Sequence, residues 1–229
     1  MDSVNKHENN SIKKLMHRLG VGAEGLVLVH EGSDIAPRDI KFLYNRMKQA
    51  TKEGTLCVFG SHKLNSKIEG DATLLTLTNQ ERILLASDKL LQLLVLEDET
   101  IFASHPSLLI GSTGKYSKFF ARTTELDYPY GSTSIFADFY DLNACVLFVG
   151  NVREVPEVRH AASLQKSVVM RNTCIKDGQV YSYLDYDCDS DFITEQLFKS
   201  NMLISESLNG MEIYGIRYRE LMDFAKRFI

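Results

Sequence analysis

Residues 125–160, ELDYPYGSTSIFADFYDLNACVLFVGNVREVPEVRH, contain the pattern on which our reading of the fold depends. Residues 127–131 (DYPYG) are typical of a turn, because proline fixes φ and glycine accepts a positive φ. Residues 135–142 then carry apolar side chains at helical spacing. Residues 144–149 form a continuous apolar run, which suits a strand buried on both faces. This order of turn, helix and buried strand predicts one unit of an α/β sheet.

His160 follows that strand and is the first candidate for a reactive side chain. In open α/β sheets, ligands bind beyond the carboxyl ends of the strands. The alternative is a structural histidine whose nitrogens are hydrogen-bonded at the start of a helix. No nucleophile accompanies His160 in its own motif, so base catalysis without a covalent intermediate fits better than nucleophilic catalysis.

The rest of the chain extends the same alternation of strands and helices. Residues 25–30, 37–50 and 55–59 read as strand, helix and strand, which predicts a parallel pair. In the C-terminal third, residues 168–173 and 179–183 flank an Asp-Gly pair, which indicates a hairpin. We therefore predict an α/β fold: a central, mostly parallel sheet flanked by helices, with an antiparallel hairpin in the C-terminal third. The sequence also predicts helices at 11–19, 79–96, 115–121, 192–199 and 218–228 and a strand at 210–216. The apolar run at 72–77 suits either a strand or a helix.

Composition narrows the class of protein. The chain has 229 residues, 44% of them hydrophobic, and a net charge of −4 with no basic run, which argues against a nucleic-acid partner. No segment reaches the ~20 apolar residues that a membrane span needs. The polar start, residues 1–10, predicts a flexible tail and no signal peptide, and hence a cytoplasmic protein with reduced thiols. Without repeats or linkers, residues 1–229 should form a single domain.

Several short patterns resemble known binding motifs but do not meet their spacing or order. The glycines of 20–25 (GVGAEG) follow a predicted helix and open a strand, the reverse of the dinucleotide-binding order. Cysteines and histidines show no ligand spacing, so we predict no metal site. The alternating aspartates of 185–191 do not fit a calcium loop, since its sixth and twelfth positions are Ser190 and Gln196. These aspartates form either a solvated strand edge or a carboxylate patch in which Asp185 and Asp187 bind an amine.

Taken together, several short pieces resemble the aminoglycoside 3-N-acetyltransferases, the antibiotic N-acetyltransferase family, and the chain looks like a divergent and shortened member. The pieces keep the family's order along nearly the whole chain, and they are LGV at 19–21, GLVLVH at 25–30, EGTL at 53–56, SHP at 104–106, YGSTSIFADFYDL at 130–142, ACVLFVG at 144–150 and His160. The resemblance implies an enzyme of antibiotic-resistance type. It would move an acetyl group from acetyl-CoA, or another acyl-CoA, to the amine of an aminoglycoside or amino sugar.

The resemblance also implies roles for individual residues. His160 would be the general base, with Glu157 as the first candidate for an acid that orients it, and Glu154 or Asp185 as alternatives. The cofactor side would be formed by His30, Glu31, Gly32, Ser33, His105, Ser132 and Ser134. A homodimer is compatible with the sequence, which does not specify the oligomeric state.

Four positions depart from the family pattern. The family glutamate three residues after the histidine is Ser163, and its Asn-Thr pair is Pro156-Glu157. Glu31 places an acid where a phosphate or thioester arm would approach, which costs affinity unless the carboxylate points away. A second hypothesis follows: a catalytically degenerate member that binds a ligand or partner without turnover.

Overall fold

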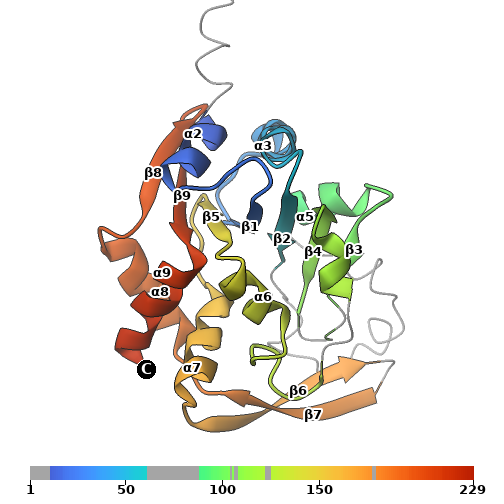
Figure 1. Ribbon diagram of the computed structural model, residues 1–229, viewed down its shortest axis with the longest axis vertical. Helices are drawn as coiled ribbons and strands as arrows, with labels where there is room; N and C mark the ends of the chain where they lie inside the picture. Colours follow the sequence, from blue (N-terminus) through green and yellow to red (C-terminus); the bar gives the residue numbers. More distant parts are fainter. Residues whose placement is uncertain (1–10, 61–87, 104, 106–107, 122–124, 177–178) are drawn as a thin grey trace, which may run out of the picture.

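A computed structural model describes residues 11–60, 88–103, 105, 108–121, 125–176 and 179–229 (Figure 1). Its main sheet has the strand order β3-β4-β2-β1-β5-β9-β8, and β6 and β7 form a separate antiparallel hairpin. The bounds are β1 (Leu26–Glu31), β2 (Thr55–Phe59), β3 (Ile101–Phe102), β4 (Ile110–Gly114), β5 (Cys145–Val149), β6 (Val169–Lys176), β7 (Gln179–Tyr186), β8 (Ile204–Leu208) and β9 (Met211–Arg217).

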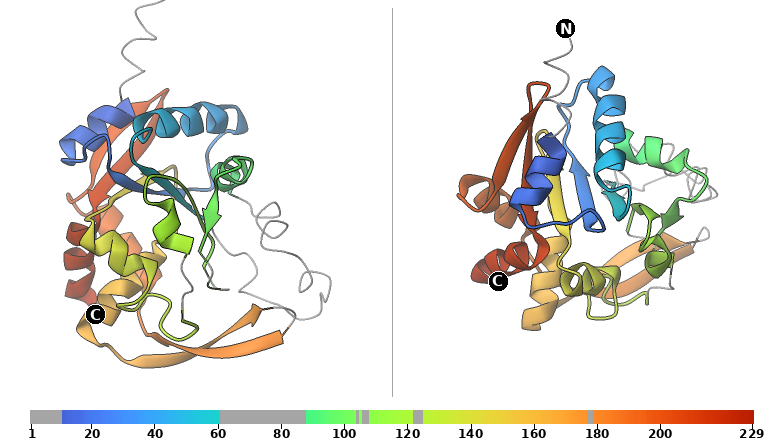
Figure 2. Two further views of the ribbon diagram at one scale, coloured as in Figure 1. Left: turned by 45° about the vertical axis from the view of Figure 1, so that its right-hand side comes forward. Right: turned by 45° about the horizontal axis from the view of Figure 1, so that its top comes forward.

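Helices cover both faces of this sheet, so the protein has three layers (Figure 2). One face packs against α2 (Ser11–Arg18), α3 (Pro37–Ala50) and α5 (Lys89–Val95). The opposite face packs against α6 (Ile135–Asp141), η4 (Pro156–Val158), α7 (Arg159–Gln165), α8 (Ser190–Lys199) and α9 (Tyr218–Ala225). Two further short helices are η3 (Ser117–Ala121) and η5 (Lys226–Phe228).

Strand alternation decides which side chains reach which layer. On β1, Leu26 and Leu28 belong to the core beneath α6–α9, whereas Val27 and Val29 belong to the core beneath α2, α3 and α5. His30 therefore points toward the α6–α9 layer and Glu31 toward α5, because successive side chains of a strand alternate between faces. This alternation separates two residues that the sequence places side by side.

The predicted α/β class, the flanking helices and the hairpin are confirmed, but the sheet is mixed. Only β1–β2 and β1–β5 are parallel, whereas β2–β4, β3–β4, β5–β9 and β8–β9 are antiparallel, among the strands that the structure describes. The buried runs of β1, β2 and β5 are the parallel centre, as their continuous apolar sequences predicted. The outer strands pair antiparallel to that centre.

The predicted elements do not include strand β8, although the sequence carries a signal for it. Asn209 and Gly210 join β8 to β9 and have φ of 57° and 79°. An Asn-Gly pair with both φ values positive is the turn that short hairpins favour. In the other hairpin, Lys176 pairs with Gln179, and the predicted Asp-Gly turn itself lies outside the described residues. The same holds for the tail at 1–10 and the apolar run at 72–77.

Within the described ranges, no helix has both the length and the apolar character to cross a membrane. The same residues contain no group of three or more His, Cys, Asp or Glu side chains arranged to hold a metal ion.

Candidate functional site

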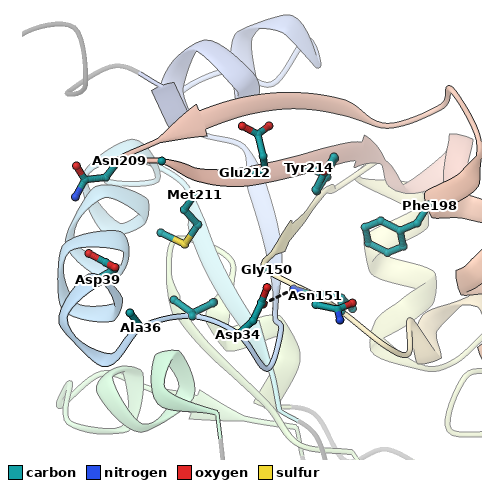
Figure 3. Close-up of a pocket in the computed structure, with 13 residues that line it drawn as sticks. Asp34, Ala36, Asp39, Gly150, Asn151, Phe198, Asn209, Met211, Glu212 and Tyr214 are labelled. Atoms are coloured by element: carbon teal, nitrogen blue, oxygen red, sulfur yellow. Dashed lines mark hydrogen bonds between the residues drawn. The ribbon is translucent and has the colours of Figure 1, made fainter.

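A cavity of about 550 Å³ lies beyond the carboxyl ends of β1 and β5 (Figure 3). Strand β1 pairs in parallel with β2 on one side and with β5 on the other. The chain therefore connects β1 to β2 on one side, and β5 lies on the other side of β1. The place where the strand order reverses in this way is a topological switch point, and open α/β sheets bind ligands beyond the carboxyl ends of the strands there. Loop residues that follow both strands line the cavity, among them Asp34, Gly150 and Asn151. The topology thus predicts a binding site where the cavity is observed.

The cavity is acidic. Asp34, Asp39 and Glu212 contribute carboxylates, and the thirteen lining residues include no lysine or arginine. Met211 and Ala36 lie on one side of it and Phe198 on the other (Figure 3). Such a lining attracts a cationic ligand and repels phosphate. The cavity therefore suits an amine far better than the nucleotide end of a coenzyme.

The loop after β1 is joined to the loop after β5 by backbone contacts. The amide of Gly32 donates to the Val149 carbonyl at 2.7 Å, and the Asn151 amide donates to Asp34 Oδ1 at 2.6 Å. A Cβ at position 32 would lie 2.4 Å from the Asn151 backbone nitrogen, so only glycine permits this approach. These donors are engaged within the protein and are not directed at a ligand.

A buried histidine–carboxylate pair lies beneath the switch point. His30 Nε2 lies 2.6 Å from Glu157 Oε1, and the Glu157 side chain is 0% exposed. The imidazole of His30 stacks between Phe59 and Phe148, with ring centroids 5.1 and 5.5 Å away. Phe59 and Phe148 are the register partners of His30 on the adjacent parallel strands. The sheet register thus fixes the imidazole that Glu157 binds.

His160 is held in one tautomer. Its Nδ1 lies 2.7 Å from the Tyr130 carbonyl oxygen, and a carbonyl can only accept, so Nδ1 carries the proton. Nε2 then has a free lone pair, and this buried atom has no hydrogen-bond partner within the described part of the chain. Burial lowers the pKa of His160, which favours the neutral ring. These properties are those of a general base.

Two further buried atoms are connected to His160 through Tyr218, whose ring contacts His160 and whose hydroxyl feels the Glu157 carboxylate electrostatically. The hydroxyl of Tyr218 and Glu157 Oε2 have no hydrogen-bond partner among the described residues. The ring centroids of Tyr218 and His160 are 6.1 Å apart. Burial and the Glu157 carboxylate both raise the pKa of Tyr218, so its hydroxyl stays protonated. Side chains from η4, α7 and α9 thus place one donor and two acceptors in the same buried region.

Solvent does not reach this group. His160 is 1% exposed and Glu157 and Tyr218 are 0% exposed, and none of the three lines the cavity of Figure 3. An aromatic path connects the cavity with Glu157: Phe198 of the cavity wall packs against Phe148, Phe148 packs against His30, and His30 contacts Glu157. In the part of the chain that the structure describes, the cavity of Figure 3 therefore does not extend to His160.

The predicted orienting acids do not contact His160. Glu157 binds His30, and Glu154 accepts from the Ser190 hydroxyl at 2.9 Å. Asp185 lies 3.7 Å from Arg159 Nη1, and burial raises its pKa to about 6. The backbone carbonyl of Tyr130 performs the orienting role, which no sequence motif specifies. A catalytic role for Glu157 stays a prediction, with His30 as its partner.

The residues predicted on the cofactor side are dispersed, and none of them lines the cavity. Glu31 accepts from the Leu90 amide at 2.6 Å at the start of α5, and burial raises its pKa to about 7. Glu31, the acid expected from the sequence to disfavour a bound phosphate, thus points away from the switch point. The Ser33 amide donates to the Asn151 carbonyl at 3.3 Å.

The remaining predicted positions lie on other elements. His105 Nε2 donates to the Leu126 carbonyl at 2.9 Å, and Ser134 caps α6 by accepting from the Phe136 amide. Ser132 is exposed, as is Asp187, the second of the two predicted substrate contacts. Their contacts with cofactor or substrate stay predictions.

A family model described as aminoglycoside 3-N-acetyltransferase matches residues 90–229, more than half of the 229-residue chain. The chain belongs to this family. Its membership confirms the resemblance seen in the sequence and makes this acetyltransferase-family protein an acyltransferase, of a family that uses acetyl-CoA. Among curated proteins, no match was found.

Solved structures share the fold of this acyltransferase. AAC-IIIb bound to CoASH superposes with a TM-score of 0.73 at 14% identity, over 96% of this chain and 95% of that one. AAC(3)-IVa in complex with a gentamicin gives 0.68 at 17% identity, over 97% and 86%. The YokD protein from Bacillus subtilis gives 0.68 at 15% identity, over 96% and 97%. At these identities the comparison establishes the fold alone.

Proposed function

We propose that this acyltransferase transfers an acetyl group from acetyl-CoA to the amine of an aminoglycoside or amino sugar, with His160 as general base and no acyl-enzyme. Family membership supports the reaction class. The observation that carries the role of His160 is its tautomer, because a Nδ1–H bound to the Tyr130 carbonyl leaves Nε2 as a proton acceptor. Structural relatives with CoASH and with a gentamicin support the substrate classes.

Direct transfer is supported by the state of the thiols. The four cysteines are free, and Cys57, Cys145 and Cys174 are buried. Burial raises the pKa of Cys145 to about 12 and that of Cys188 to about 11, so both stay protonated at neutral pH and are poor nucleophiles. A neutral imidazole that removes the amine proton needs no covalent intermediate.

The buried group around His160 and the acidic cavity suit different parts of the two substrates. The unpaired Nε2 of His160 can accept a proton from the attacking amine, and the unpaired hydroxyl of Tyr218 can donate to the acyl oxygen. The acidic cavity does not fit phosphates but does fit a polycationic amine, so we place the body of the acceptor substrate there. The coenzyme would then lie outside this cavity, and Ser132, one of the residues predicted on the cofactor side, is exposed.

The experiment measures thiol release from acetyl-CoA and propionyl-CoA with gentamicin and glucosamine as acceptors. His160→Ala should lower the rate by about 10²–10⁴-fold, the usual contribution of a general base. His17→Ala is the matched control, because His17 is exposed on α2. A His160→Ala rate within about threefold of the wild type would refute the assignment of the base.

A second function is favoured by the burial of His160 and its separation from the cavity. In that case the protein binds a cationic ligand in the acidic cavity and does not turn it over. Calorimetry with gentamicin separates the two cases: binding without thiol release supports the second function, and thiol release supports the first.

A further inference from the structure

We propose that Tyr218 is a further catalytic residue, whose hydroxyl donates a hydrogen bond to the oxygen of the acetyl group during transfer. This inference rests on the proposed function of His160. The buried core contains three polar atoms that packing does not explain. Among the described residues, His160 Nε2, Glu157 Oε2 and the Tyr218 hydroxyl have no hydrogen-bond partner.

Such atoms are costly. A buried polar group left unpaired destabilises a fold by about 1–3 kcal/mol, and native proteins contain few of them. Tyr218 is fully buried against Phe139, with ring centroids 5.8 Å apart, so a phenylalanine would fill the same space without this cost. The presence of a hydroxyl here therefore points to a partner that is absent from the free chain.

The three atoms define the chemistry of that partner. His160 Nε2 and Glu157 Oε2 are acceptors, and the protonated Tyr218 hydroxyl is the donor. An amine nitrogen supplies N–H groups for the two acceptors, and a carbonyl oxygen accepts from the donor. An amine adjoining an acyl carbonyl, as in amide formation, is thus complementary to all three. Exclusion of water from a buried site also protects the thioester from hydrolysis.

The step balances with these groups. The amine nitrogen attacks the thioester carbonyl carbon, a C–N bond forms, and the π pair moves onto the oxygen that Tyr218 stabilises. His160 Nε2 takes one proton from the amine while Glu157 Oε2 accepts the other N–H. When the C=O bond re-forms, the C–S bond breaks, and the leaving thiolate takes the proton from His160. The products are the amide and free CoA thiol.

The test is Tyr218→Phe, measured by kcat and KM for acetyl transfer, by calorimetry with CoA and by thermal unfolding. Removal of one such donor should lower kcat by about 10²–10³-fold, with KM for acetyl-CoA within about threefold. The melting temperature should stay equal or rise, because the variant lacks an unpaired buried hydroxyl. A merely structural tyrosine would not combine lost activity with retained or increased stability.

Tyr44→Phe is the matched control. Tyr44 is buried beneath the opposite face of the sheet, and its hydroxyl donates to Glu97 at 3.1 Å. This variant should lose some stability and keep kcat. For Tyr218→Phe, a kcat within threefold of the wild type, or activity lost in parallel with stability, overturns the role of Tyr218 while wild-type turnover upholds the proposed function. A wild type without turnover on every acceptor overturns both.

Discussion

Replacement of Glu157 by alanine should destabilise the protein more than most single substitutions. The variant lacks the carboxylate that lies 2.6 Å from His30 Nε2, and the imidazole stays stacked between Phe59 and Phe148. Since the Glu157 side chain is 0% exposed, solvent does not take its place. A buried hydrogen-bonding group that loses its partner costs about 1–3 kcal/mol, and the space left by the deleted side chain adds to that cost.

The effect is large enough for two independent assays. At about 2–4 °C per kcal/mol for a domain of this size, a loss of about 1–3 kcal/mol should lower the melting temperature by about 2–12 °C. Urea denaturation should show the same loss as a lower midpoint with an unchanged slope. Glu154→Ala is the control: its side chain is 47% exposed in the same segment, so its loss should be below about 1 kcal/mol.

A double-mutant cycle with His30→Ala completes the test. If the two side chains stabilise the fold through each other, the double variant should be less destabilised than the sum of the single variants, by about 0.5–3 kcal/mol. A loss below about 1 kcal/mol in Glu157→Ala, or additivity in the cycle, would show that the pair does not support the site as argued.

Three further outcomes are expected. Asp39→Asn combined with Glu212→Gln should raise KM for gentamicin about 2- to 30-fold with kcat unchanged, at 0.2–1 kcal/mol per exposed charge, and an unaltered KM would exclude the cavity as the amine site. Because burial lowers the pKa of His160, the acid limb of the kcat/KM profile should have its midpoint below pH ~6.5, and a midpoint above that value contradicts the assignment. Burial raises the pKa of Glu31 to about 7 and that of Asp185 to about 6. The folded state thus binds these protons more tightly than the unfolded state. Their stabilising contribution is complete below pH ~4 and is lost as pH rises through 6 to 7, so the wild type should lose free energy of unfolding over that range relative to Glu31→Gln with Asp185→Asn.

Much of the fold could be predicted because the signals are local. The helix at 37–50 and the strand at 55–59 begin and end as expected, because apolar periodicity, an early proline and Gly54 all lie within or beside the segments themselves. The direction of the outer strands could not be predicted, since pairing depends on residues far apart in sequence. Strand β8 could have been found from the Asn209-Gly210 pair.

The sequence by itself determined the α/β class, the family and the choice of His160 as the residue to examine, since these depend on the order and spacing of residues along the chain. Only the tertiary structure decided the environment of that histidine. The carbonyl of Tyr130, thirty positions away, sets its tautomer, and Glu157 contacts His30, which points from β1 into the same layer. The hydroxyl of Tyr218 joins the group from α9, the helix that follows the last strand. Hydrogen-bond partners and solvent exclusion arise when distant segments pack together, and no local pattern encodes them.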